Sequence, residues 1–126
     1  MFVTALLGGG TPHRVYDAFL RGELVPVFSQ DTLAELTEVL TRPGLRALTT
    51  GAEVRTFLTL IQRDGLIVRP THRVHVCRDP KDNMILDCAL AGQVSCIVTG
   101  DHDLLALHPF RGIRILRPRD FLQLLP

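Results

Sequence analysis

Acidic residues at three places in the chain have the types and spacing that divalent-cation chemistry needs. Asp101 and Asp103 follow an apolar run, Asp79 and Asp82 lie in a polar stretch, and Glu35 lies in a largely apolar helical pattern. Carboxylates gathered in one place repel each other unless a cation neutralises them, and oxygen ligands favour Mg²⁺ or Mn²⁺. Such a site suits phosphodiester hydrolysis, because the cation activates water and stabilises the developing charge.

Each acidic residue also has an ordinary structural interpretation when it is taken alone. An aspartate at a helix start, such as Asp82, can serve as a helix cap. Glu35 can be a solvated helix residue, and Thr99-Gly100-Asp101 can be a turn into a short helix. The metal-site hypothesis therefore depends on a fold that brings the three groups together.

Alternating strand and helix patterns indicate how the fold would position these groups. Short apolar runs with the length of buried strands occur at Leu24–Phe28, Leu66–Val68, Val94–Val98 and Ile113–Leu116. Pro26 weakens the first of these, because proline has no backbone N–H to donate. Strands that alternate with helices pair in parallel through right-handed crossovers. The pattern predicts a single domain over residues 1–126, an α/β/α sandwich of three layers with a parallel sheet.

Helix signals fill the segments between the predicted strands. Helices are expected from Thr11 to Gly22, Ser29 to Leu40, Thr50 to Ile61, Asp82 to Ala91, over Leu104–Leu107, and after Pro118. In open parallel sheets, ligands bind beyond the carboxyl ends of the strands. The acidic residues at the ends of the predicted strands are therefore expected to meet at that edge.

A second pattern of possible metal ligands is the H-x-x-H-x-C formed by His72, His75 and Cys77. It lacks a second ligand pair at the spacing of zinc sites, so zinc is the less favoured alternative. His102, between two aspartates, is expected to face substrate or solvent. The three cysteines form no C-x-x-C pair, which favours a reducing cytoplasm over a disulfide framework.

The composition predicts a folded protein but does not indicate which partner it binds. Apolar residues make up 46% of the chain and charged residues 21%, so a buried core is expected and disorder is not. The formal net charge of +1 neither favours nor excludes nucleic acid. Met1–Leu7 is too short for a membrane span and lacks a basic leader. We expect a cytoplasmic protein with no membrane partner.

Two blocks of sequence, taken in order, resemble the PIN-domain toxins of toxin–antitoxin systems. The first runs from Cys77 to Gly92 and the second from Ile97 to Leu105. The acidic helix Leu33–Leu40, followed by Arg42-Pro43, and the ending from Gly112 to Leu122 are similar to the same family. The resemblance covers essentially the whole chain.

The resemblance implies a site and an activity. It assigns catalytic and metal-binding positions to Glu35, Asp82 and Asp101, and auxiliary positions to Asp79, Asp103 and Thr99. The implied activity is Mg²⁺- or Mn²⁺-dependent endoribonuclease action on single-stranded RNA. The implied partners are RNA, a small cognate antitoxin protein and a second copy of the chain in a possible homodimer.

The N-terminus departs from the family pattern. Family members begin with a hydrophobic strand that ends in Asp-Thr-Asn, whose aspartate is a principal metal ligand, and Met1–Leu7 resembles the segment just after it. We therefore expect the first strand to be missing and cleavage to be impaired. In that case Leu24–Phe28 and Val94–Val98 would either close the gap by pairing directly, which we favour, or recruit a segment from elsewhere, such as another chain.

Two other classes of function stay open at this point. One is a degenerate, non-catalytic domain that binds RNA or a protein. The other is phosphoryl transfer through an aspartyl-phosphate, which Asp101-x-Asp103 allows. Enzymes of that type usually place the nucleophile after the first strand, where this chain has no aspartate.

Overall fold

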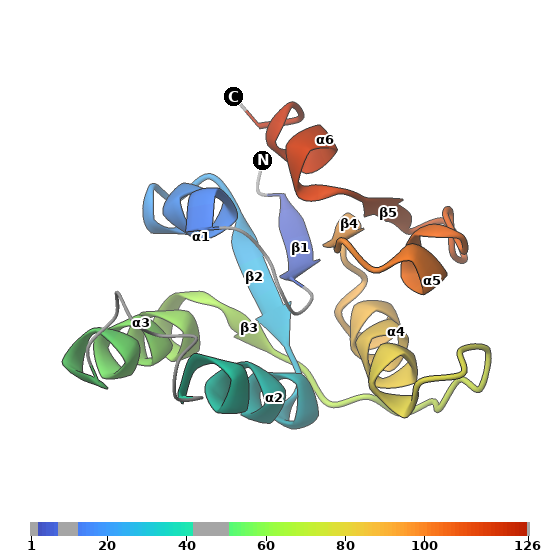
Figure 1. Ribbon diagram of the computed structural model, residues 1–126, viewed down its shortest axis with the longest axis horizontal. Coiled ribbons are helices and arrows are strands. Elements are labelled where there is room, and N and C mark those ends of the chain that lie inside the picture. The colour runs from blue at the N-terminus through green and yellow to red at the C-terminus, as the bar shows by residue number, and fades with distance from the viewer. Residues whose placement is uncertain (1–2, 8–12, 42–50, 126) are drawn as a thin grey trace.

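The computed structural model describes residues 3–7, 13–41 and 51–125, and these form an α/β fold around one parallel sheet (Figure 1). The strands are β1 (Thr4–Leu7), β2 (Val25–Phe28), β3 (Leu66–Ile67), β4 (Cys96–Val98) and β5 (Arg114–Leu116). Their order across the sheet is β3-β2-β1-β4-β5, and every pair is parallel. The prediction of a parallel α/β fold is confirmed.

Helices cover both faces of this sheet. They are α1 (His13–Leu20), α2 (Gln30–Thr41), α3 (Gly51–Asp64), α4 (Pro80–Gly92), α5 (His102–Leu105) and α6 (Pro118–Leu122). Figure 1 shows α4 and α5 on one side of the sheet and α1 and α3 on the other. Successive strand residues point to opposite faces, so Leu6 and Ile97 pack beneath α4, whereas Leu7 and Val98 pack against α1 and α6. Two separate cores result, one on each face.

The centre of the sheet differs from the expectation. Direct pairing of the β2 and β4 segments was wrong, because the chain's own residues Thr4–Leu7 lie between them as β1. Ala5 is the partner of both Pro26 and Cys96, and it is fully buried. A run of small and aliphatic side chains suits this position, since a central strand is covered on both faces.

Pro26 is compatible with a strand because of where its nitrogen lies. The N–H of Val25 donates to Val3 O across the β1 side, at 2.8 Å. Alternation along the strand then directs the Pro26 nitrogen to the β3 side. There the ladder begins only at Val27, which pairs with Leu66, so the missing N–H removes no ladder hydrogen bond.

Several predicted boundaries shift by one or two residues. Helix α4 begins at Pro80 rather than Asp82, and its N-cap is Asp79. Strand β4 is shorter than the predicted Val94–Val98. The predicted helix signals Thr11-Pro12, Pro43-Gly44 and Thr50 lie outside the described residues.

Across the described ranges, no helix combines the length and apolar character that crossing a membrane requires.

Candidate metal centre

Three carboxylates converge at the carboxyl edge of the sheet. Asp82, Asp101 and Asp103 each offer an oxygen atom, and these atoms all lie within 4.8 Å of one another. Asp82 is buried, with 6% of its surface exposed, whereas the two other aspartates are exposed. Two of these residues were predicted as principal ligands, and Asp103 was predicted as an auxiliary one.

The β4–α5 connection fixes the orientation of Asp101. Its N–H donates to Thr99 Oγ1 at 3.0 Å, and its Oδ1 accepts from the N–H of Asp103 at 2.8 Å as the N-cap of α5. Thr99 is buried, with 2% of its surface exposed. This hydroxyl, which the family resemblance placed near the site, therefore holds the turn that presents Asp101.

The start of α4 presents Asp82 to the same place. Asp79 accepts the N–H of Lys81 at 2.9 Å and so begins the helix, which leaves Asp82 in the first turn. The alternative interpretation of Asp82 as the helix cap is wrong, because Asp79 has that role. Asp79 is exposed and lies outside the group of three.

Asn83 supports the site, although no role was predicted for it from the sequence. Its Oδ1 accepts from the N–H groups of Val76 and Cys77, and its Nδ2 donates to Cys77 O at 3.1 Å. These bonds hold the loop before α4 against the helix next to Asp82. The only available signal was an amide side chain in the polar stretch beside that aspartate.

The carboxylates change each other's titration. Burial, the charge of Asp101 and a hydrogen bond shared with it raise the pKa of Asp82 to about 6, with further contributions from Asp79 and Asp103. Desolvation and like charges both disfavour the ionised form of a carboxyl group. Without a cation, the carboxylates of this site therefore repel one another, and Asp82 ionises less readily than an ordinary aspartate.

Glu35 lies near this centre but outside the group of three. It is on α2, and its Oε1 lies 3.8 Å from Nζ of Lys81, the residue next to Asp82. Its side chain is 27% exposed. Glu35 was predicted to converge with the aspartates, and in the structure its carboxylate faces Lys81, the neighbour of Asp82 in the chain.

Arg78 supplies a positive charge at the rim. Its guanidinium lies 3.3 Å from Oδ2 of Asp103, and 90% of the arginine side chain is exposed. Exposed ion pairs of this kind typically contribute less than about 1 kcal/mol. Arg78 can therefore leave Asp103 at little cost when another charged group approaches.

The zinc alternative does not find support in the geometry. Within residues 3–7, 13–41 and 51–125, the one group of three possible ligands is the aspartate group, so His72, His75 and Cys77 do not assemble. Burial and the nearby carboxylates raise the pKa of the Cys77 thiol. A zinc site needs the thiolate form, and these surroundings oppose it.

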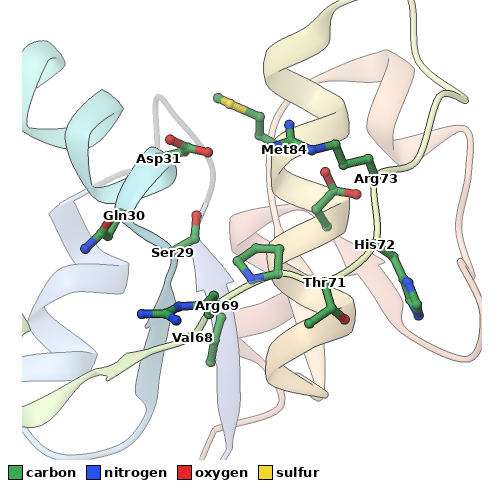
Figure 2. Close-up of a pocket in the computed structure, with 11 residues that line it drawn as sticks. Ser29, Gln30, Asp31, Val68, Arg69, Thr71, His72, Arg73 and Met84 are labelled. Atoms are coloured by element: carbon green, nitrogen blue, oxygen red, sulfur yellow. The ribbon is translucent and has the colours of Figure 1, made fainter.

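A separate hollow of about 250 Å³ lies beyond the ends of β2 and β3, between α2 and α4. Figure 2 shows Asp31 on α2 and Met84 on α4 pointing toward each other across it, whereas His72 points away. Asp87 also lines the hollow, and its Oδ1 accepts a hydrogen bond from the N–H of Val74 at 2.7 Å. None of the three clustered aspartates lines this hollow.

The donor set fits a hard divalent cation. Oxygen ligands around an octahedral Mg²⁺ lie about 3–4 Å apart, so carboxylate oxygens already within 4.8 Å of one another need only small movements. A cation would also relieve the repulsion that raises the pKa of Asp82. Asp82, Asp101 and Asp103 are the residues that would hold it.

Comparison with known proteins agrees with this geometry. Residues 1–103 match the model of a family described as "PIN domain", a family of nucleases. The chain is also 29% identical over 109 residues to "Uncharacterized protein MJ1680" of Methanocaldococcus jannaschii, an alignment that covers 85% of this chain and 70% of that protein. Because the family match covers most of the sequence and includes all three clustered aspartates, the chain belongs to the PIN-domain family.

Proposed function

We propose that this chain is a metal-dependent endoribonuclease domain that cleaves phosphodiester bonds of single-stranded RNA. The observation that carries the proposal is the convergence of Asp82, Asp101 and Asp103 within 4.8 Å in a PIN-domain chain. Open parallel sheets bind ligands at the carboxyl edge where this group lies.

Each residue has a role that follows from its surroundings. A bound Mg²⁺ or Mn²⁺ would supply Lewis-acid activation of the phosphodiester and neutralise the carboxylates. Asp101 is oriented by its bond to the N–H of Asp103, and Asp82 approaches from the buried side. Glu35 is proposed as a further acidic group of the site, and exposed Arg78 is available to contact a phosphate.

The test combines cleavage with metal binding. A fluorescent single-stranded RNA is incubated with the protein in Mg²⁺, Mn²⁺ or EDTA, and Mn²⁺ binding is measured separately by paramagnetic resonance. We expect metal-dependent cleavage that is slow, because β1 contributes no carboxylate to the site, and that Asp101→Asn abolishes, because the amide keeps the shape but loses the charge. The matched control is Asp64→Asn, since Asp64 is paired with Arg63 on α3 outside the acidic group. Cleavage that survives in EDTA would contradict the proposal.

A non-catalytic RNA-binding domain is the second candidate function. The observation that favours it is the composition of β1, whose residues Thr4, Ala5, Leu6 and Leu7 contribute no carboxylate to the site. Fewer acidic ligands hold a cation more weakly. RNA binding and Mn²⁺ binding without any cleavage would support this second candidate.

The toxin role and the antitoxin partner belong to the same proposal. The support is the family membership together with the blocks Cys77–Gly92 and Ile97–Leu105 that resemble toxins. Induced expression should arrest growth of a bacterial host, and Asp101→Asn should relieve the arrest. Equal growth with both forms would count against a toxin.

A further inference from the structure

A positively charged groove lies next to the acidic group, because its lining includes Gly100, the residue before Asp101. It has a volume of about 490 Å³ and is lined by Arg14, Gly100, Arg117, Pro118, Arg119 and Leu122. The three arginines are exposed, and no acidic side chain is part of the lining. Within the described part of the chain, none of the three makes an ion pair.

Backbone hydrogen bonding fixes the distance between this groove and the aspartates. The N–H of Thr99 donates to Leu116 O at 3.0 Å, which joins the ends of β4 and β5. Gly100 and Asp101 continue from one strand, and Arg117 continues from the other. The added Cβ of an alanine at Gly100 would meet nothing within 4 Å, so the surface between Arg117 and Asp101 is open.

We propose that this groove, defined by Arg14, Arg117 and Arg119, binds the backbone phosphates of a single-stranded nucleic acid that extends from the acidic group. The inference rests on the proposed nuclease function, because it places the scissile phosphate at Asp101. It adds the path that the strand takes on leaving that position.

The chemistry of the lining selects phosphates rather than base edges. Arginine side chains are donors only, and their planar fork fits two oxygens of one phosphate. The lining has no acceptor side chain that could read the donor groups of adenine or cytosine, and it otherwise offers apolar Pro118 and Leu122. The apolar part can contact a sugar or the face of a base. Binding should therefore be tolerant of sequence.

The positively charged groove ends near Arg14, where a second hollow begins. Arg14 borders a second hollow that contains Asp17, Arg21 and Glu23. There Arg21 donates to Glu23 at 3.0 Å, so its charge is already compensated. Arg117 and Arg119 line only the first groove, next to Gly100, and not this second hollow.

The experiment measures binding without cleavage. Anisotropy of a fluorescent oligouridylate is recorded in EDTA between about 50 and 300 mM KCl, for the parent protein and for Arg14→Gln, Arg117→Gln, Arg119→Gln and the triple variant. Each phosphate contact to a single strand contributes about 0.7 to the slope of log K against log salt. We expect each single variant to weaken binding about eightfold at about 50 mM salt and the triple variant to lower the slope by about 2.

The matched control is Arg55→Gln, which removes the same charge from an exposed position on α3. A triple variant that is folded by circular dichroism and keeps the salt slope of the control would overturn the proposal. So would an equal loss of binding in Arg55→Gln, or competition by polyglutamate as strong as by oligouridylate. Oligoadenylate should bind with an affinity similar to that of oligouridylate, and a strong preference between them would also contradict the proposal.

The two proposals can fail separately. If the arginine variants lose RNA binding and the parent shows no metal-dependent cleavage, the groove stands and the nuclease function falls. If the parent cleaves RNA and the arginine variants bind it unchanged, the nuclease stands and the groove falls.

Discussion

The carboxylate of Asp87 accepts a hydrogen bond of 2.7 Å from the backbone N–H of Val74. Both residues are buried, and they join the middle of α4 to the loop that follows β3. A buried N–H without a partner is costly, so this bond holds the loop in place. Together with Asn83, Asp87 makes α4 the scaffold for the approach to the acidic group.

Asp87→Ala should destabilise the protein by about 1–3 kcal/mol, because the buried N–H of Val74 loses its acceptor. Urea denaturation followed by circular dichroism measures the change. Asp87→Asn keeps an acceptor oxygen at the same position and should have a smaller effect. Equal stability of the alanine variant and the parent would show that water or another group replaces the carboxylate.

Asp82→Asn should stabilise the metal-free protein at pH 8. The pKa of an aspartate in an unfolded chain is about 3.9, whereas the pKa of Asp82 in the folded protein is raised to about 6. The folded state holds this proton more tightly, so the contribution of Asp82 favours folding at low pH and is lost as the pH rises through about 6. The variant should gain roughly 1–3 kcal/mol over the parent at pH 8 and nothing near pH 4.

Denaturation in EDTA at both pH values checks this prediction. Asp64→Asn is the control, because its partner Arg63 lowers the pKa of Asp64 and no stabilisation at pH 8 is expected. Mn²⁺ should reverse the order, stabilising the parent more than Asp82→Asn. A variant that is less stable than the parent at pH 8 in EDTA would show that repulsion is not the dominant effect.

Glu35→Gln should separate a functional loss from a structural one. The pair of Glu35 with Lys81 is long and partly exposed, so its removal should change the free energy of unfolding by less than about 1 kcal/mol. If Glu35 belongs to the site, the cleavage rate should nevertheless fall by at least tenfold. Parallel cleavage and denaturation measurements decide the matter, and unchanged cleavage would exclude Glu35 from the site.

Leu6→Ala should destabilise the protein by about 2–5 kcal/mol, since Leu6 is 1% exposed at the centre of the sheet. Leu20→Ala is the control, because that leucine on α1 is 53% exposed and its truncation should change stability little. Thermal or urea denaturation compares the two. Similar small effects in both variants would mean that Thr4–Leu7 does not form the central strand.

The strands and helices after residue 20 follow largely from sequence because their signals are local. The apolar runs at Leu24–Phe28 and Ile113–Leu116 and the Pro and Gly boundaries are visible without tertiary information. The role of Thr4–Leu7 is not local. Its place between β2 and β4 depends on pairing with distant residues such as Cys96, and a four-residue apolar segment carries too little periodicity to show this.

The acidic centre was predictable only in part, because some of its contacts follow from topology and others depend on side-chain conformation. Asp82 and Asp101 follow elements whose ends share one edge, so their proximity follows from topology. The inclusion of Asp103 depends on the tight turn into α5, and the pairing of Glu35 with Lys81 depends on two long side chains. The sequence does not specify those rotamers.

The three clustered aspartates and the hydrogen bonds that orient them come from one continuous stretch, residues 74–103. This stretch also contains β4, which pairs with β1 and β5, so the site is built on the centre of the sheet. It cannot open as a whole while β1 stays paired, and the amides of Ile97 and Val98 should exchange with solvent deuterium as slowly as those of β1. Loss of the site through opening of this stretch is in this way coupled to loss of the sheet.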